Sequence, residues 1–201
     1  MPKVKVPRKS TAIDMTAMCD VAFLLLTFFI LTTKFRAQEV VQIDIPSSTA
    51  QIPIPDKDIL MFQISPDGKV FFGLDDQPTR LGLLDRLEEL YSMKFTPKQR
   101  DAFRLTELWG MDIHDLPKWL DLTANERANS VQPGLKIDTT GGEHQLEDLI
   151  LYSRKTNTNL RIAIKADKTT EYKSFDKVIE ALQNRKVNRF NLITSAKTSK
   201  E

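Results

Sequence analysis

Residues Ala12 to Thr33 read AIDMTAMCDVAFLLLTFFILTT, and this stretch decides how the chain is organised. It contains no Lys, Arg, Gly or Pro, and its charged side chains are those of Asp14 and Asp20. At about 1.5 Å per residue, a helix of this length spans roughly 33 Å, against about 30 Å for the hydrocarbon core of a bilayer. The stretch therefore predicts a single transmembrane helix over residues 12–33.

The charges on either side of this helix predict its orientation. Four basic residues precede it and two follow it: Lys3, Lys5, Arg8 and Lys9, then Lys34 and Arg36. Cytoplasmic flanks carry the excess of Lys and Arg. We therefore expect residues 1–11 in the cytoplasm and the remainder of the chain outside it.

Two other interpretations of the apolar stretch are open. A cleaved signal peptide also combines a basic start with an apolar run. The segment that follows, TTKFRAQ, has Lys and Arg where a cleavage site needs small residues, and an aspartate inside the run is abnormal for a signal. A buried helix of a soluble domain fits less well, because the stretch is apolar on every side.

Asp20 is the most informative residue of the helix. A carboxylate near the bilayer centre costs about 2.5–3.5 kcal/mol, so such a group normally faces a partner helix or a water-filled path and can exchange protons. Thr16, Asp20 and Thr27 follow the spacing i, i+4 and i+11, which places them along one side of a helix. The simpler alternative is that Asp20 only makes a hydrogen bond between helices. Asp14 fits an interfacial carboxylate at the start of the helix.

The composition excludes several classes of protein. Of 201 residues, 29 are Lys or Arg and 27 are Asp or Glu, which is typical neither of a nucleic-acid-binding arm nor of an acidic disordered tail. The single cysteine, Cys19, cannot form an internal disulfide, and His114 and His144 lack the companions of a zinc site. No glycine-rich phosphate loop is present. We therefore expect no metal site, no cofactor and no nucleic-acid partner.

The segment after the helix begins as a tether and continues as strands. Residues 34–57 contain three prolines and no periodic run, which predicts an extended linker with one short strand at Val40–Ile45. Next, Ile59–Ile64 and Lys69–Gly73 flank Ser65-Pro66-Asp67-Gly68, a hairpin with typical turn residues.

Periodicity predicts helices and strands further along the chain. Leucines at helical spacing predict helices over Arg80–Met93 and Gln145–Lys155. Between Leu160 and Thr194, an alternating run, an amphipathic run from Phe175 to Leu182 and a second alternating run predict a strand, a helix and a strand. A unit of this length allows a parallel crossover. Asp167, in the turn after the first strand, is interpreted as a turn residue rather than a catalytic one.

Residues 92–142 read as a helical insertion. Thr96-Pro97-Lys98-Gln99 has the pattern of a capping box, followed by Phe103, Leu105 and Leu108 at helical spacing, and Thr123 begins a second possible cap. The simpler interpretation is an elaboration that packs onto the domain, and the alternative is a partner-binding surface built on Trp109 and Trp119.

Two segments resemble the ExbD/TolR family. KSTAIDMTAMCDVAFLLLTFFILTTKF is similar to the family's membrane segment, in which an aspartate precedes a Val-x-Phe-Leu-Leu-Leu run. The matching residues are Ile13, Asp14, Thr16, Asp20, Val21, Phe23, Leu24, Leu25, Leu26, Phe28 and Phe29. LRIAIKADKTTEYKSFDKVIEALQNRKVNRFNLIT is similar to its strand, "ADK" turn, helix and final strand.

The resemblance implies a fold and a function. It implies an α+β protein with one N-terminal membrane helix, a flexible tether and a small sandwich-like periplasmic domain with a mixed sheet, over residues 58–196, before a tail at 197–201. It also implies a bacterial inner-membrane motor subunit, not an enzyme, in which Asp20 carries protons, the coupling ion, beside the polar side chains of Thr16 and Thr27.

The partners follow from the same resemblance. They are a polytopic ExbB/TolQ-like protein, a TonB- or TolA-like energy transducer, and a second copy of the chain within the complex. The alternative function is a single-pass anchor or adaptor that presents a periplasmic binding domain without ion coupling.

Overall fold

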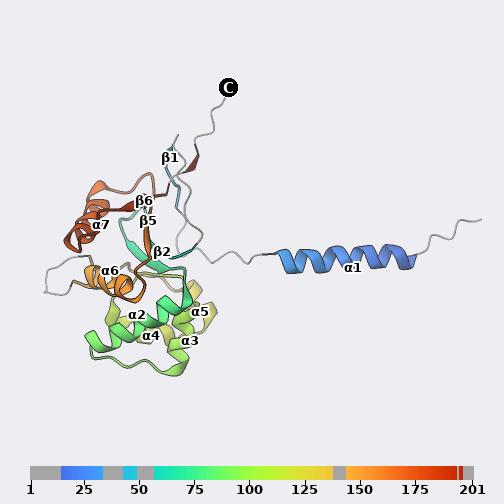
Figure 1. Cartoon of the computed structure of the whole chain (residues 1–201), viewed down its shortest axis with the longest axis horizontal. Helices are drawn as coiled ribbons and strands as arrows, with labels where there is room; N and C mark the ends of the chain where they lie inside the picture. The colour runs from blue at the N-terminus through green and yellow to red at the C-terminus, as the bar shows by residue number, and fades with distance from the viewer. Residues whose placement is uncertain (1–14, 34–42, 49–56, 138–143, 194, 197–201) are drawn as a thin grey trace, which may run out of the picture. The chain divides into compact units, whose positions relative to one another are not determined.

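The structure is a computed structural model that describes residues 15–33, 43–48, 57–137, 144–193 and 195–196. The chain divides into two compact units, Met1–Ala37 and Gln38–Glu201 (Figure 1). The first unit contains the helix α1 (Met15–Thr32), and the second contains every other helix and strand. The predicted combination of an N-terminal apolar helix with a mixed α+β fold is confirmed.

Helix α1 is the one helix in the described residues that is long and apolar enough to cross a membrane. None of its eighteen residues is buried within the protein. Two of its threonines satisfy their hydroxyl groups on the helix backbone: Thr27 donates to the Leu24 carbonyl at 2.9 Å and Thr32 to the Phe28 carbonyl at 2.8 Å. Such bonds lower the cost of placing a hydroxyl in an apolar environment.

The second unit is built on a five-stranded sheet with the order β4-β3-β2-β5-β6. Its strands are β2 (Ile59–Ile64), β3 (Val70–Leu74), β4 (Leu108–Trp109), β5 (Arg161–Ala166) and β6 (Phe190–Leu192). The pairs β2–β3 and β3–β4 are antiparallel, whereas β2–β5 and β5–β6 are parallel. The parallel pairing of β5 with β6 through an intervening helix is the crossover that the sequence predicts.

The hairpin between β2 and β3 closes as predicted. The Gly68 N–H donates to the Ser65 carbonyl at 2.9 Å, and Gly68 has a φ of 75°, which a residue with a side chain adopts only under strain. The turn fixes the register at Ile64 opposite Val70. That register turns the alternating apolar side chains of both strands to one face of the sheet.

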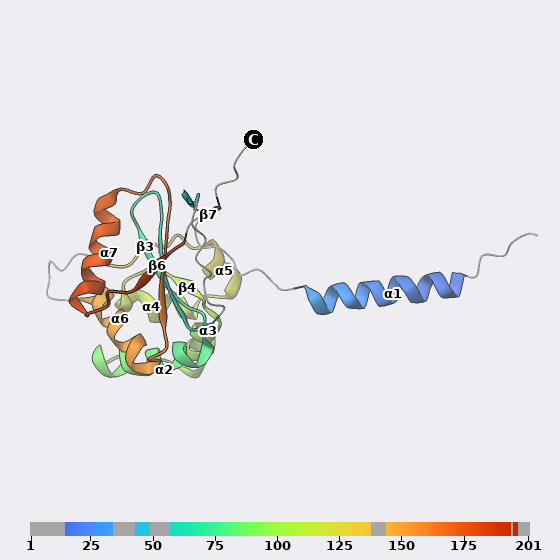
Figure 2. The same ribbon diagram turned by 45° about the horizontal axis from the view of Figure 1, so that its top comes forward.

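Three long helices pack on this face: α2 (Gln77–Leu90), α6 (Gln145–Thr156) and α7 (Tyr172–Asn184). Figure 2 shows α6 and α7 to one side of the strands. Leu60, Phe62 and Ile164 of the sheet are fully buried in one cluster with Leu84, Leu149 and Leu182 of the helices. This single core fixes the helices against the sheet.

The insertion forms α3 (Pro97–Leu105), β4, the 3₁₀ helix η1 (Ile113–Asp115), α4 (Leu116–Asp121) and α5 (Ala124–Asn129). The capping box predicted at Thr96 is present, and the cap predicted at Thr123 is also a capping box. The insertion shares the main core, because Trp109 packs edge-on against Phe72 and Phe103. Trp109 is therefore a core residue that ties the insertion to the sheet.

The structure corrects several predicted boundaries. Leu108, which followed the helical spacing of α3, lies instead in β4, where Gly73 is its Cα partner. Helix α2 begins at Gln77 rather than Arg80, because Asp76 caps it through the Thr79 N–H and Pro78 occupies its first turn.

The short strand predicted in the tether is wrong over Ile43–Ile45, which is irregular, and Val40–Gln42 lies outside the described residues. The strand lies further on, at β1 (Ser47–Ser48), which pairs in parallel with β7 (Ser195–Ala196). A strand needs a partner with free backbone groups, and β7 offers them to Ser47 and Ser48.

Candidate functional site

Three polar side chains of α1, those of Thr16, Asp20 and Thr27, lie on one side of the helix. At about 100° per residue, Thr16, Asp20 and Thr27 fall within an arc of about 40°, and Asp20 precedes Thr27 by about 10 Å along the axis. Asp20 and Thr16 are exposed and Thr27 is half-buried. Asp14 lies outside the described residues.

The Asp20 carboxylate has no hydrogen bond or ion pair with any residue that the structure describes. Its neighbours one turn away along the helix include the apolar side chains of Phe23 and Leu24. The Thr27 hydroxyl donates a hydrogen bond to the Leu24 carbonyl, so its oxygen is left to accept a hydrogen bond from another chain or from water. The Asp20 carboxylate and the Thr27 oxygen are therefore open to a partner from another chain or from water.

A second cluster of charged residues lies where β5 ends, in the turn Ala166-Asp167-Lys168. The Asp167 carboxylate accepts hydrogen bonds from the Thr169 N–H at 2.8 Å and the Thr169 hydroxyl at 2.6 Å. Its other oxygen accepts from the Asp44 N–H at 2.7 Å. The hydrogen bonds from Thr169, and next that from Asp44, hold the pKa of Asp167 below its ordinary value. Asp167 thus shapes the turn, as the sequence predicts, and also binds the tether.

Lys168 completes this contact with the tether. Its N–H donates to the Asp44 carbonyl at 2.9 Å, and its ammonium group lies 2.8 Å from the Asp44 carboxylate. The hydrogen bond and the charge of Asp44 raise the pKa of Lys168. Sequence reasoning missed Asp44, because a single aspartate in a proline-containing linker gives no periodic signal and its partners lie more than 120 positions away.

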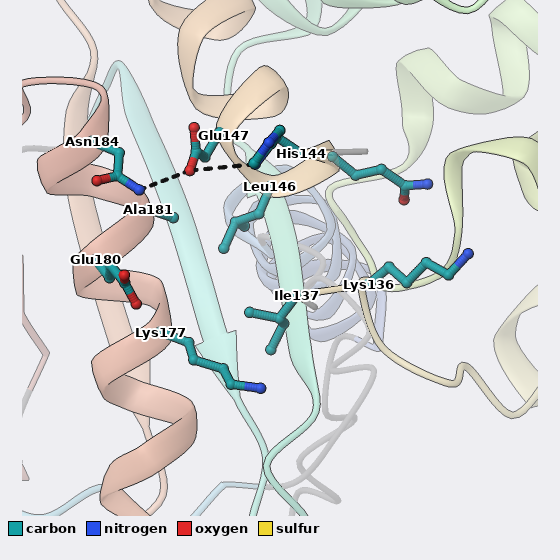
Figure 3. A pocket seen from close by; sticks show the side chains of 10 residues that line it. Lys136, Ile137, His144, Leu146, Glu147, Lys177, Glu180, Ala181 and Asn184 are labelled. Atoms are coloured by element: carbon teal, nitrogen blue, oxygen red, sulfur yellow. Dashed lines mark hydrogen bonds and ion pairs between the residues drawn. The ribbon is translucent and has the colours of Figure 1, made fainter. Parts of the chain in front are cut away.

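A small pocket lies between α6, α7 and the segment 136–137 (Figure 3). Its volume is about 140 Å³, and Glu147 stands between His144 and Asn184. One Glu147 oxygen accepts from Asn184 at 2.9 Å and lies 3.7 Å from His144 Nδ1, and the other lies 3.2 Å from Arg185 Nε. Both oxygens are engaged in linking α6 to α7, which is a structural role. Across the described ranges, no three His, Cys, Asp or Glu side chains are grouped to hold a metal ion.

Comparisons with known proteins bear on the whole chain. The family model for "Biopolymer transport protein ExbD/TolR" matches residues 7–197. No curated protein and no solved structure matches the chain. The match includes α1 with Asp20, the five-stranded sheet and the insertion, so nearly the entire sequence supports one assignment. The chain belongs to the ExbD/TolR family of biopolymer transport proteins.

Proposed function

We propose that this protein is the single-pass subunit of a proton-driven motor, and that Asp20 carries the proton. The observation that supports the proposal most is a lone carboxylate in an otherwise apolar helix, without a partner among the described residues, in a chain of this family. In this proposal α1 spans the inner membrane with its N-terminus in the cytoplasm. An ExbB/TolQ-like polytopic protein surrounds it and supplies the polar surface that Asp20 needs.

The proton step uses the two charge states of one side chain. The Asp20 carboxylate takes up a proton from the compartment of higher proton potential, and the neutral acid can pass an apolar part of the partner's surface. It then releases the proton to the other compartment and recovers its charge. One charge moved through 100 mV supplies about 2.3 kcal/mol, so a few protons are enough for a mechanical step.

The domain that follows the tether would pass this motion to a TonB- or TolA-like partner. Its sheet and helices share one buried core, so it can transmit a force as a unit. A second copy of the chain within the complex would place two Asp20 carboxylates inside the same surrounding ExbB/TolQ-like assembly.

The test is the substitution Asp20→Asn in the full chain, expressed with its polytopic partner. Asn keeps the size and hydrogen-bonding capacity of Asp but cannot carry a proton. We expect co-purification with the partner at close to the wild-type level and complete loss of the energised phenotype. Asp20→Glu restores a titratable group about one methylene further out, and we expect partial activity.

Thr27→Val is the matched control, because it removes a polar group from the same side of the helix but no titratable one; we expect only a mild loss. Asp14→Asn is also expected to be mild, since water near the interface solvates that carboxylate. Full energised activity of Asp20→Asn would contradict the proton-carrying role. It would favour instead an adaptor that presents the domain without ion coupling.

A further inference from the structure

A wide groove lies at the end of the sheet where β5 and β6 begin. Its volume is about 890 Å³, and its walls come from the end of α6, the first residues of β5 and the loop between α7 and β6. Four cationic side chains line it: Arg154, Arg161, Lys186 and Arg189. No Asp or Glu is among its lining residues.

These four cations have no carboxylate partner in the part of the chain that the structure describes. Arg161, Lys186 and Arg189 are exposed and Arg154 is half-buried. Some exposed cations elsewhere on the domain are paired, as Arg86 is with Glu89 and Lys118 with Asp115, and others, such as Lys94 and Lys173, stand apart from the groove. Four unpaired cations around one open concavity favour an anionic ligand.

The edge of the sheet beside the groove is a poor template for a peptide strand. Strand β6 has three residues, fewer than the five or six typical of a strand, so an added strand would gain few backbone hydrogen bonds. The flanking side chains suit an interface between water and lipid better. Phe190 lines the groove and is half-buried, so it presents apolar surface beside the cationic side chains.

The tether brings a membrane surface within reach of the groove. Ten peptide steps separate Thr33, after α1, from Ile43, and they span up to about 33 Å when extended. The groove lies at the opposite end of β5 from the Asp44 contact, a distance of about 20 Å for a six-residue strand. A domain confined in this way meets the bilayer at a high effective concentration, so weak contacts with headgroups suffice.

We propose that this groove binds the phosphate headgroups of anionic phospholipids in the membrane that holds α1. Arg side chains bind phosphate oxygens in a bidentate manner, and each basic residue near an anionic surface strengthens the attraction. Bound to lipid, the domain rests on its own membrane, and it must leave that surface before it can engage a distant partner. This proposal does not depend on proton transfer by Asp20.

The test uses the full chain in nanodiscs with a fluorophore attached in the groove. Asn188 is exposed and lines the groove, so Asn188→Cys combined with Cys19→Ser gives one labelling site. Nitroxide-labelled headgroups quench the fluorophore when the groove rests on lipid. We expect strong quenching in discs that contain phosphatidylglycerol and little in discs of phosphatidylcholine alone. Raising the salt to about 0.5 M should weaken the quenching, because screening shortens the range of the attraction.

The decisive variant is Arg161→Gln with Arg189→Gln, for which we expect the fraction of bound domain to fall by about tenfold or more. The matched control is Lys94→Gln with Lys173→Gln, which removes the same charge from exposed positions outside the groove, and it should leave quenching unchanged. Asp20→Asn should also leave it unchanged, which separates this proposal from the proton-carrying role.

Equal quenching in both kinds of disc, or an equal loss in the control, would overturn the proposal. So would tight binding of poly-glutamate to the groove without quenching by headgroups, which would identify an acidic polypeptide as the ligand.

Discussion

Asp112 holds three segments of the domain together through one carboxylate. It accepts from the His114 N–H at 3.0 Å and from Gln145 at 2.9 Å, and it pairs with Lys136 at 3.0 Å. Burial, the largest single influence, acts to raise the pKa of Asp112, but the hydrogen bonds from His114, Gln145 and Lys136 outweigh it and lower the pKa below its ordinary value. The charged form of Asp112 is therefore the one that stabilises the fold.

We predict that Asp112→Asn lowers the free energy of unfolding by about 1 kcal/mol at pH 7. A carboxyl whose pKa is lowered by folding adds stability above its ordinary pKa, near 3.8, and loses it as the pH falls through the lower folded value. The difference from the wild type should therefore shrink below about pH 4. Urea unfolding at several pH values measures it.

Asp115→Asn is the control, because Asp115 is 63% exposed and its partner Lys118 is 84% exposed, so we expect little change at any pH. An Asp112→Asn effect that is independent of pH would contradict the assigned role of the charge.

At the level of single elements, the tether is where the structure differs most from the prediction made from the sequence. Asp167 and Lys168 bind the backbone of Asp44, so the domain already holds the chain at a position inside the linker predicted over residues 34–57. The backbone hydrogen bonds should contribute more than the ion pair, because Lys168 is 57% and Asp44 77% exposed and water screens such pairs.

We therefore predict different effects for the two sides of this contact. Asp167→Ala removes the acceptor of the Asp44 N–H, and the hydrogen exchange of that amide should accelerate by about tenfold or more. Lys168→Gln keeps its own backbone N–H and loses only the exposed ion pair, so exchange at Asp44 should accelerate by less than about fivefold. Equal acceleration in both variants would show that the ion pair carries the contact.

The elements that the sequence predicts best are those with a strong local signal. Strand β2 has the predicted bounds Ile59–Ile64, and α6 differs from its prediction by one residue, because alternation and leucine spacing report directly on which face is buried. Strand β4 was missed since two residues carry no period, and its existence depends on pairing with β3. Arg80 is only 3% exposed and donates to the carbonyls of Leu74, Asp75 and Arg104, an arrangement that no local pattern reveals.

The functional residues also differ in how far the sequence alone points to them. Asp20 stands out in the sequence because a charge in an apolar run is costly, and the helix then places Thr16 and Thr27 on its side by geometry alone. The basic groove could not be predicted, because Arg154 and Arg161 meet Lys186 and Arg189 only after α7 returns the chain to the edge of β5.

At the scale of the whole molecule, the arrangement of charge around α1 decides how the protein is oriented. Four basic residues precede the apolar stretch and two follow it, a moderate excess on the N-terminal side. Because Lys and Arg are retained in the cytoplasm, this excess predicts that the domain beginning at Gln38 lies outside. The motor that we propose requires this orientation, since the domain must reach an outer partner.

We predict that alkaline phosphatase fused after Glu201 is active in intact cells, because this reporter folds only outside the cytoplasm. Replacing Lys3, Lys5, Arg8 and Lys9 by Gln removes the excess and leaves Lys34 and Arg36 as the nearer basic flank, so phosphatase activity per fusion protein should fall severalfold as part of the population inverts. The matched control replaces four exposed lysines of the domain, far from the helix ends, and should have no effect, because only charges within about 15–20 residues of a membrane helix set its topology. A full-length fusion that is inactive in intact cells, or one released in soluble form after cleavage behind Thr33, would contradict the membrane-anchored arrangement and the proton path through Asp20.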